Sequence, residues 1–128
     1  MADDVLGRGF AFPFAPDGAF GAVQGADAVV QAIRHVLLTE PGERVGRPTF
    51  GAGLRRFLFR PNTLATRAEL QATVIAAIRR DEPRAVLQAV DVATAEGEPT
   101  RLDIRVRFTL IGSNVPMNLV FPYYLDGA

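Results

Sequence analysis

Carboxylates near the Pro41-Gly42 turn are the first groups in the sequence whose spacing could serve acid–base chemistry. Glu40 and Glu43 flank the turn and Glu82 lies farther along, so a pair of them could act as proton donor and base in sugar hydrolysis. Beside a tight turn such side chains are more often solvated or paired, and Arg44 directly follows Glu43 as an ion-pair partner. A lysozyme-like, cell-wall-cleaving enzyme is therefore kept as an alternative.

Other signatures of catalysis and ligand binding are incomplete. Gly51-x-Gly53 begins a dinucleotide fingerprint, but Arg56 stands where the third glycine belongs and no strand–helix–strand unit surrounds it. His35 has no cysteine, second histidine or carboxylate pair to complete a metal or proton-transfer site. We therefore expect no catalytic residue, no cofactor and no metal, and we expect the chain not to be an enzyme.

Arginines interleave with apolar side chains after the turn. Arg55, Arg56 and Arg60 surround Phe57, a pattern that nucleic-acid-binding surfaces also use. The whole chain is nevertheless neutral, with 14 basic and 14 acidic residues, and only its middle third is basic. We favour a salt-bridged or partner-facing surface and expect no nucleic-acid partner, with an arginine-rich nucleic-acid or adaptor domain kept as a second alternative.

Length and hydropathy indicate one globular domain. A chain of 128 residues with 48% hydrophobic and 22% charged residues can bury a core of its own. The acidic start, Met1-Ala2-Asp3-Asp4, lacks the pattern of a signal peptide, and no run approaches the roughly 18 apolar residues of a membrane span. We expect a protein without a membrane partner that is not exported by the standard route.

A structural corner is predicted where a helical pattern ends and the chain reverses. Proline and glycine fix or permit the backbone angles of such a turn, and glycine also allows close backbone packing. The residues assigned to this corner are Pro41, Gly42, Glu43, Arg44, Pro48, Phe50 and Gly51. Residues 45–59 are expected to form two short strands or one irregular hairpin.

Two helices are predicted on either side of the corner. The first runs from Asp27, a candidate N-cap, to near Thr39. The second follows a capping box formed by Thr66 and Glu69 and ends before the exit loop 81–84. Residues 1–24 mix glycine, proline and phenylalanine without a period, so we expect an irregular N-terminal arm there and a single domain over 25–128.

The last third predicts an antiparallel meander. Its clearest strand runs from Arg101 to Ile111, with apolar residues alternating between Leu102 and Leu110. A preceding strand places Val86, Gln88, Val90 and Val92 on one face, and a final strand near Val115–Leu125 is expected at an edge because prolines accompany it. The predicted fold class is α+β, with two main helices packed on a small, mainly antiparallel sheet.

Four features follow one another along the chain: the apolar entry from Gly9 to Phe14, the run from Leu38 to Arg44, the segment Pro48-x-Phe50-Gly51 and the triplet Glu82-Pro83-Arg84. Together they resemble the small baseplate wedge protein family of contractile tails, which includes type VI secretion and extracellular injection counterparts. Members of this family are also labelled lysozyme-like, a label for which this sequence offers no physical reason.

The resemblance implies structural work in a phage tail-like particle. The fold would be like the inner domain of the sheath subunit, and the protein would anchor the sheath and start its polymerisation by sharing strands with sheath arms. It would also dock to larger wedge proteins and to inner tube or hub proteins, in six copies or a multiple of six.

Two sets of residues are expected to contact these partners. By resemblance, Glu82, Pro83 and Arg84 meet the larger wedge proteins. From the strand pattern, Arg101, Arg105 and Arg107 face a polar surface and are assigned to a sheath-binding edge, where they would pair with acidic residues of sheath arms.

Overall fold

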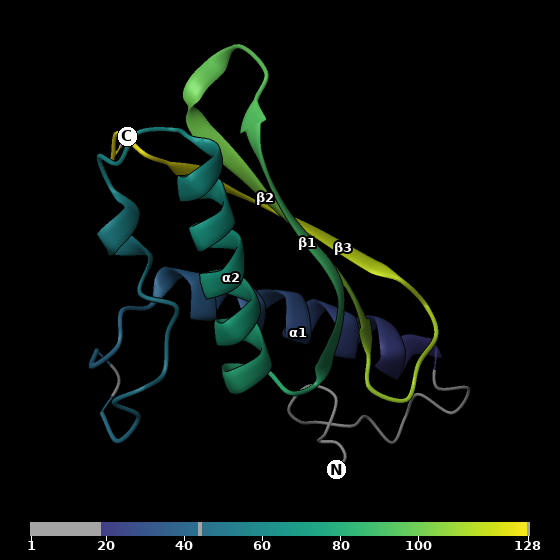
Figure 1. Cartoon of the computed structure of the whole chain (residues 1–128). Coiled ribbons are helices and arrows are strands. Elements are labelled where there is room, and N and C mark those ends of the chain that lie inside the picture. The colour runs from purple at the N-terminus through teal and green to yellow at the C-terminus, as the bar shows by residue number, and fades with distance from the viewer. Residues whose placement is uncertain (1–18, 44, 128) are drawn as a thin grey trace.

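Two α-helices, one short 3-10 helix and three strands follow one another along the chain (Figure 1). The structure, a computed structural model, describes residues 19–43 and 45–127. Its elements are α1 (Ala19–Leu38), η1 (Leu54–Phe57), α2 (Leu64–Asp81), β1 (Ala85–Ala95), β2 (Glu98–Leu110) and β3 (Met117–Tyr124). The predicted α+β class is confirmed.

The three strands form one antiparallel sheet in the order β1-β2-β3. The apolar face expected of the central strand is confirmed, because every second residue of β2 is buried: Leu102, Ile104, Val106, Phe108 and Leu110. β3 lies at an edge, as its proline predicts. A proline has no N–H to donate, so it fits a strand position whose backbone groups face away from a neighbouring strand.

The helices cover one face of the sheet. α2 packs mainly against β1, while α1 runs crosswise to α2 and touches β3 (Figure 1). Their buried side chains recur at spacings of three and four, as expected of amphipathic helices: Val29, Ile33, Val36 and Leu37 in α1, and Leu70, Val74, Ala77 and Ile78 in α2. The opposite face of the sheet is left without a covering layer among the described residues.

The first helix begins earlier than the sequence predicts. α1 starts at Ala19, so residues 19–24 are helical instead of irregular, and Asp27 lies inside the helix instead of capping it. Gly25 is buried within α1, and packing there outweighs the roughly 1 kcal/mol that glycine costs in a helix. The rest of the predicted arm, residues 1–18, lies outside the described residues.

Two further local predictions are wrong. The N-cap of α2 is Thr63, whose Oγ1 accepts from the Thr66 N–H at 3.2 Å, while Thr66 is buried in the first turn. Residues 45–59 form turns and η1 instead of strands. Their glycines at positive φ, at Gly46, Gly51 and Gly53, bend the chain too often for an extended ladder.

A β-bulge changes the face pattern of β1. Leu87 pairs with Phe108 and Ala89 with Arg107, so Gln88 is the extra residue. Leu87 therefore lies on the same face of the sheet as Val90. The sequence predicts instead that Gln88 shares this face with Val90, which is wrong. Periodicity alone cannot reveal a bulge, because the inserted residue resets the alternation.

Candidate functional site

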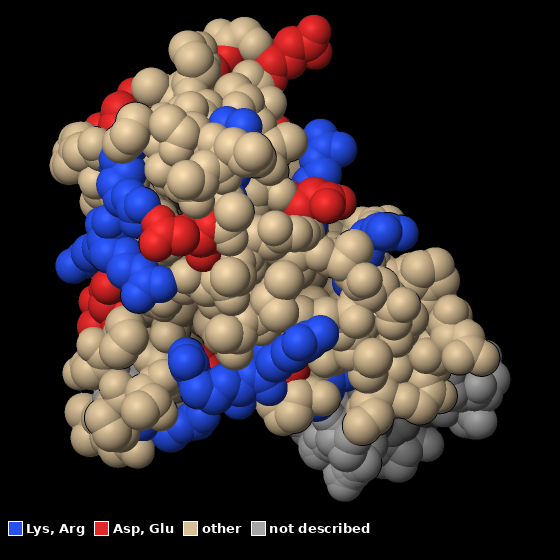
Figure 2. All heavy atoms as spheres, in the orientation of Figure 1, with Lys and Arg blue, Asp and Glu red and all other residues tan. Residues whose placement is uncertain are grey.

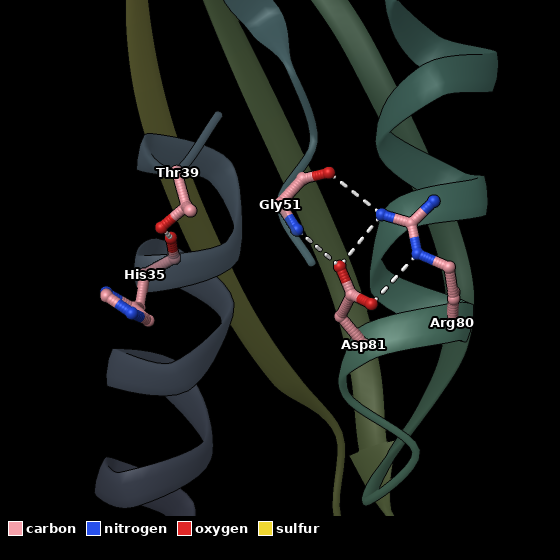
Figure 3. A network of polar contacts seen from close by, with 5 residues as sticks. All are labelled: His35, Thr39, Gly51, Arg80 and Asp81. Carbon is pink, nitrogen blue, oxygen red and sulfur yellow. Dashed lines mark hydrogen bonds and ion pairs between the residues drawn. The ribbon is translucent and has the colours of Figure 1, made fainter. Parts of the chain in front are cut away.

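A polar network ties the corner after α1 to the C-terminal end of α2 (Figure 3). The Gly51 N–H donates to Asp81 Oδ2 at 2.8 Å, and Arg80 Nη2 donates to the Gly51 carbonyl at 2.8 Å. Arg80 also binds both carboxylate oxygens of Asp81, at 2.9 and 2.8 Å. Both backbone polar groups of one corner residue, Gly51, are therefore held by neighbouring residues of α2.

Gly51 is required by its backbone angle and by its surroundings. Its φ is +113°, and a Cβ there would lie 2.5 Å from the Thr39 carbonyl oxygen. Thr39 is itself fixed, because its hydroxyl donates to the His35 carbonyl at 2.6 Å. The Ala52 N–H donates to the Val36 carbonyl at 3.0 Å, and this carbonyl also accepts from the Thr39 N–H at 3.3 Å, so the corner is bonded to the last turn of α1.

Asp81 is held in its charged form. The Arg80 hydrogen bond is the main cause that lowers the pKa of Asp81, and the Gly51 N–H adds to it, while burial opposes the shift. The Asp81 side chain is 3% exposed and that of Arg80 is 45% exposed. A carboxylate this buried must keep its partners, so the pair is a structural clamp between two segments distant in sequence.

The remaining corner residues divide into a buried anchor and an exposed rim. Phe50 is buried beneath the Arg47 guanidinium, 4.9 Å from the ring centroid, and its ring lies 5.6 Å from that of His35. The exposed rim consists of Pro41, Gly42, Glu43 and Pro48. Arg44, the last residue assigned to the corner, lies outside the described residues.

The candidate acid–base carboxylates hold backbone groups. Glu40 Oε2 accepts from the Arg55 N–H at 3.0 Å, and Glu43 Oε1 accepts from the Glu40 N–H at 3.1 Å. Glu82 is buried and paired with Arg84. In the described ranges no three histidine, cysteine or acidic side chains converge on a possible metal position.

The Glu82-Pro83-Arg84 triplet joins α2 to β1. Glu82 Oε2 accepts from Arg84 Nε at 2.7 Å, and Glu82 Oε1 accepts from Arg84 Nη2 at 2.8 Å. This bidentate pair raises the pKa of Arg84. One edge of the Arg84 fork is thus used inside the chain, while its side chain stays 27% exposed and Pro83 is exposed.

The three arginines assigned to a sheath edge are not at an edge. They lie on β2, the central strand, on the face away from the helices. Arg101 pairs with Glu98 at 2.8 Å and lies 3.3 Å from Asp103, so it is committed within the chain. Arg105 and Arg107 are exposed and line a hollow of about 310 Å³ together with Asn118 and Val120 of β3.

The hydrogen-bond register shows what the outer edge of β3 presents. The Leu125 N–H donates to the Thr100 carbonyl at 2.8 Å, so these residues form a bonded pair and bonded pairs alternate from there. Asn118, Val120 and Pro122 therefore direct their backbone groups away from β2. Pro122 has no N–H, which leaves Asn118 and Val120 as the donors that face outward midway along β3.

The outer edge of β1 is partly covered. Val90 pairs with Val106, whose backbone groups face β3, so Val90 directs its own groups away from β2. Gln71 of α2 donates its side-chain amide to the Val90 carbonyl at 2.6 Å. Sequence periodicity could not identify this contact, because it joins a helix side chain to a strand edge through packing.

A pocket of about 320 Å³ adjoins the C-terminal half of β3. Its lining is mixed: Glu40 and Arg55 contribute charged groups, and the apolar part comes from Leu37 and Leu38 of α1, Leu54 of η1, and Phe121 and Tyr123 of β3. The Tyr123 hydroxyl donates to the Leu54 carbonyl and closes one side. Burial is the main cause that raises the pKa of Tyr123.

The arginines around η1 form a surface with its own partners. Figure 2 shows blue side chains gathered beside η1 and below the C-terminal end of α2. The guanidinium carbons of Arg56 and Arg60 lie 5.1 and 5.2 Å from the centroid of the Phe57 ring, and Arg60 pairs with Glu69. Across the described residues, no helix is both long and apolar enough to cross a membrane.

Comparison with known proteins identifies the family. Residues 23–115 match the model of the family described as baseplate wedge protein gp25, and the chain belongs to that family. No curated protein matches the chain.

Three solved structures are similar to it. A putative tail lysozyme from Geobacter sulfurreducens is 33% identical, with 77% of this chain and 89% of that chain covered and a TM-score of 0.70. A chain of the anti-feeding prophage baseplate is 28% identical over 77% of this chain and 67% of its own length, with a TM-score of 0.53. A chain of the type VI secretion baseplate complex is 17% identical, with 84% of this chain and 98% of that chain covered and a TM-score of 0.61. At this identity the likeness supports the fold alone.

Family and fold together define a structural baseplate component of contractile injection machines.

Proposed function

We propose that this protein anchors the sheath in its baseplate and starts sheath polymerisation by accepting an extended sheath arm at the outer edge of β3. Strand addition gains affinity from main-chain hydrogen bonds and needs a rigid sheet with a free edge. β3 supplies that edge through the outward N–H and C=O groups of Asn118 and Val120. β1 is the poorer acceptor because Gln71 already occupies the Val90 carbonyl.

The triplet Glu82-Pro83-Arg84 is proposed to contact the larger wedge proteins, with Glu82 as a positioning residue. An arginine carries five N–H donors in a planar fork. Glu82 takes donors from Nε and Nη2 of Arg84, so Nη1 is held in a fixed plane toward solvent. A carboxylate or backbone carbonyl of a partner would complete this fork.

The proposed role is structural and not enzymatic. Glu40 and Glu43, the closest candidates for an acid–base pair, each accept a backbone N–H: Glu40 from Arg55 of η1 and Glu43 from Glu40 across the turn. By family resemblance the protein assembles in the cytoplasm, in six copies or a multiple of six, and also meets inner tube or hub proteins.

Reconstitution with purified sheath protein tests the edge. Val120→Pro removes an outward N–H of β3 without touching the ladder to β2, as Pro122 already does two residues on. Sheath assembly followed by light scattering and electron microscopy should start with the wild-type protein and fail, or lag about tenfold, with this variant.

Val92→Pro is the matched control. Val92 pairs with Ile104, so its backbone groups face the outer edge of β1 in the same way. This variant should still start assembly. Normal assembly with Val120→Pro and failure with Val92→Pro would move the receiving edge to β1, and normal assembly with both would refute strand addition.

A further inference from the structure

Two hollows adjoin β3, one toward each face of the sheet. The hollow of about 310 Å³ lies on the uncovered face and reaches from Asp91 of β1 across Arg105 and Arg107 of β2 to Asn118 and Val120 of β3. The pocket of about 320 Å³ lies between the last turn of α1 and the residues of β3 from Phe121 to Tyr124. Both include residues of β3, the strand to which, by the proposed function, a sheath strand is added.

The two hollows differ in chemistry. Among the described residues, no ion pair binds the exposed guanidinium of Arg105 or Arg107, although Asp91 pairs with Arg105 across the β1–β2 ladder. The pocket beside α1 instead has Leu37, Leu54 and Phe121 in its lining and exposed Leu38 at its rim. Its charged lining residues are Glu40 and Arg55, and the Glu40 carboxylate already accepts from the Arg55 N–H. The first fits an anionic side chain and the second a large apolar one.

Strand geometry links these preferences to a sequence pattern. Residues of an added strand that lie opposite Asn118 and Val120 point to the uncovered face, and their neighbours point toward the helices. Side chains of the added strand on the uncovered face then come within reach of Arg105 and Arg107, which lie on β2 directly across from Val120 and Asn118. The inward position opposite Phe121 or Tyr123 faces the pocket.

We infer that the two hollows select the incoming strand by its alternation of acidic and apolar side chains. They accept acidic side chains on the uncovered face of the sheet and one large apolar anchor on the face toward the helices. This inference rests on the proposed function and names the chemistry of the sheath segment that it requires. Pro122 supports it, since its missing N–H removes one main-chain donor from the edge beside the pocket, so a side chain that enters the pocket can supply affinity there. The anchor also fixes register, because a slip of one residue would exchange acidic and apolar side chains between the two hollows.

Binding of purified sheath protein to surface-immobilised full-length protein tests the selection. Leu38→Arg places a cation at the rim of the pocket, and because Leu38 is 69% exposed, the change leaves the core intact. We expect the dissociation constant to rise at least about tenfold, the size of a typical interface anchor. Val45→Arg is the matched control, because Val45 is a fully exposed valine outside both hollows, and it should bind as the wild type does.

Arg105→Glu combined with Arg107→Glu tests the hollow on the uncovered face. The double variant should weaken binding at least about tenfold at low salt, whereas Arg79→Glu, an exposed charge in the last turn of α2, should change it little. Replacement of acidic residues by lysine in the bound sheath segment should restore binding to the double variant and to no other.

The outcomes separate the inference from the function on which it rests. Loss of binding with Val120→Pro, together with wild-type affinity for Leu38→Arg and for the double arginine variant, would keep strand addition and overturn the selection by the hollows. Unchanged binding with Val120→Pro would refute the edge itself. A sheath segment that binds β3 without an acidic and apolar alternation would overturn the inference even if every variant weakened binding.

Discussion

At the scale of single residues, the corner depends on one glycine and one buried carboxylate. The sequence predicts Gly51 as a corner residue because glycine permits unusual backbone angles, and its φ of +113° confirms the reason. Its partners could not be predicted, because Arg80 and Asp81 lie about thirty residues away and periodicity carries no information on such contacts.

Gly51→Ala should be strongly destabilising. The added Cβ would meet the Thr39 carbonyl oxygen at 2.5 Å while the backbone stays in a region that alanine disfavours. We expect a loss on the order of 2–4 kcal/mol in the free energy of unfolding, measured by urea denaturation. Gly46→Ala is the control, because its φ of +79° is similarly disfavoured but nothing lies within 4 Å; a loss of about 1 kcal/mol is expected there. Equal losses at both positions would contradict the close approach to Thr39.

The lowered pKa of Asp81 predicts that the free energy of unfolding decreases at acid pH. Its folded pKa lies below the ordinary value of 3.8, so its contribution is complete above that value and is lost as the pH falls through the lowered folded pKa. Asp81→Asn should cost about 1–3 kcal/mol at neutral pH, because Arg80 loses a charged acceptor.

The difference between wild type and Asp81→Asn isolates this group from the other carboxylates that titrate in the same range. Denaturation at neutral pH and at successively lower pH below 3.8 should show the two stabilities converging. A constant difference down to the acid limit would mean that Asp81 keeps its ordinary pKa.

At the scale of elements, the sequence predicts correctly those helices and strands whose apolar residues recur at a constant spacing. β2 is predicted well because its five alternating apolar residues all face the helices. α1 is predicted only from its middle onward, since glycines mask its first turns. In β1 the common face of Val90 and Val92 is predicted correctly, but the residues before them are assigned to the wrong face because Gln88 resets the alternation. The prediction of an edge for β3 holds because proline limits ladder pairing in any context.

Deletion of Gln88 should be tolerated. Leu87 would still pair with Phe108 and Ala89 with Arg107, so removing the extra residue leaves a regular ladder with both faces unchanged. We expect a change of about 1 kcal/mol or less in the free energy of unfolding. The deletion also tests whether the bulge serves assembly, since the twist it adds would be lost without loss of fold.

Deletion of Asp91 is the matched comparison for Gln88. Asp91 lies in the regular part of β1, so its removal forces residues on one side of it to exchange faces. Exposure of Leu87 and Val90 would then cost roughly 3–6 kcal/mol, enough to prevent folding of most small domains. Equal stability of the two deletions, measured by thermal denaturation, would show that Gln88 is not the inserted residue.

At the scale of the whole molecule, the charge distribution decides between a partner-facing surface and a nucleic-acid surface. The neutral chain concentrates arginine in its middle third, and sequence alone cannot tell whether those charges project a common field. The structure shows that several are held locally: Arg60 by Glu69, Arg80 by Asp81 and Arg84 by Glu82. A neighbouring carboxylate cancels most of the field that each would add at the distance of a phosphate.

The protein should therefore bind duplex DNA no more tightly than a dissociation constant of about 10⁻⁴ M at physiological salt, the weak end of non-specific binding. Fluorescence anisotropy with a labelled duplex at two salt concentrations measures this, and Glu69→Gln, which frees Arg60, gives the sensitivity of the assay. Affinity in the micromolar range that falls steeply with salt would favour the nucleic-acid alternative, because release of counterions from many phosphates requires arginines that are not already paired. Weak binding that Glu69→Gln strengthens only slightly would mean that the arginines near η1 are arranged for ion pairing and for packing on Phe57, which is what a rigid assembly component needs.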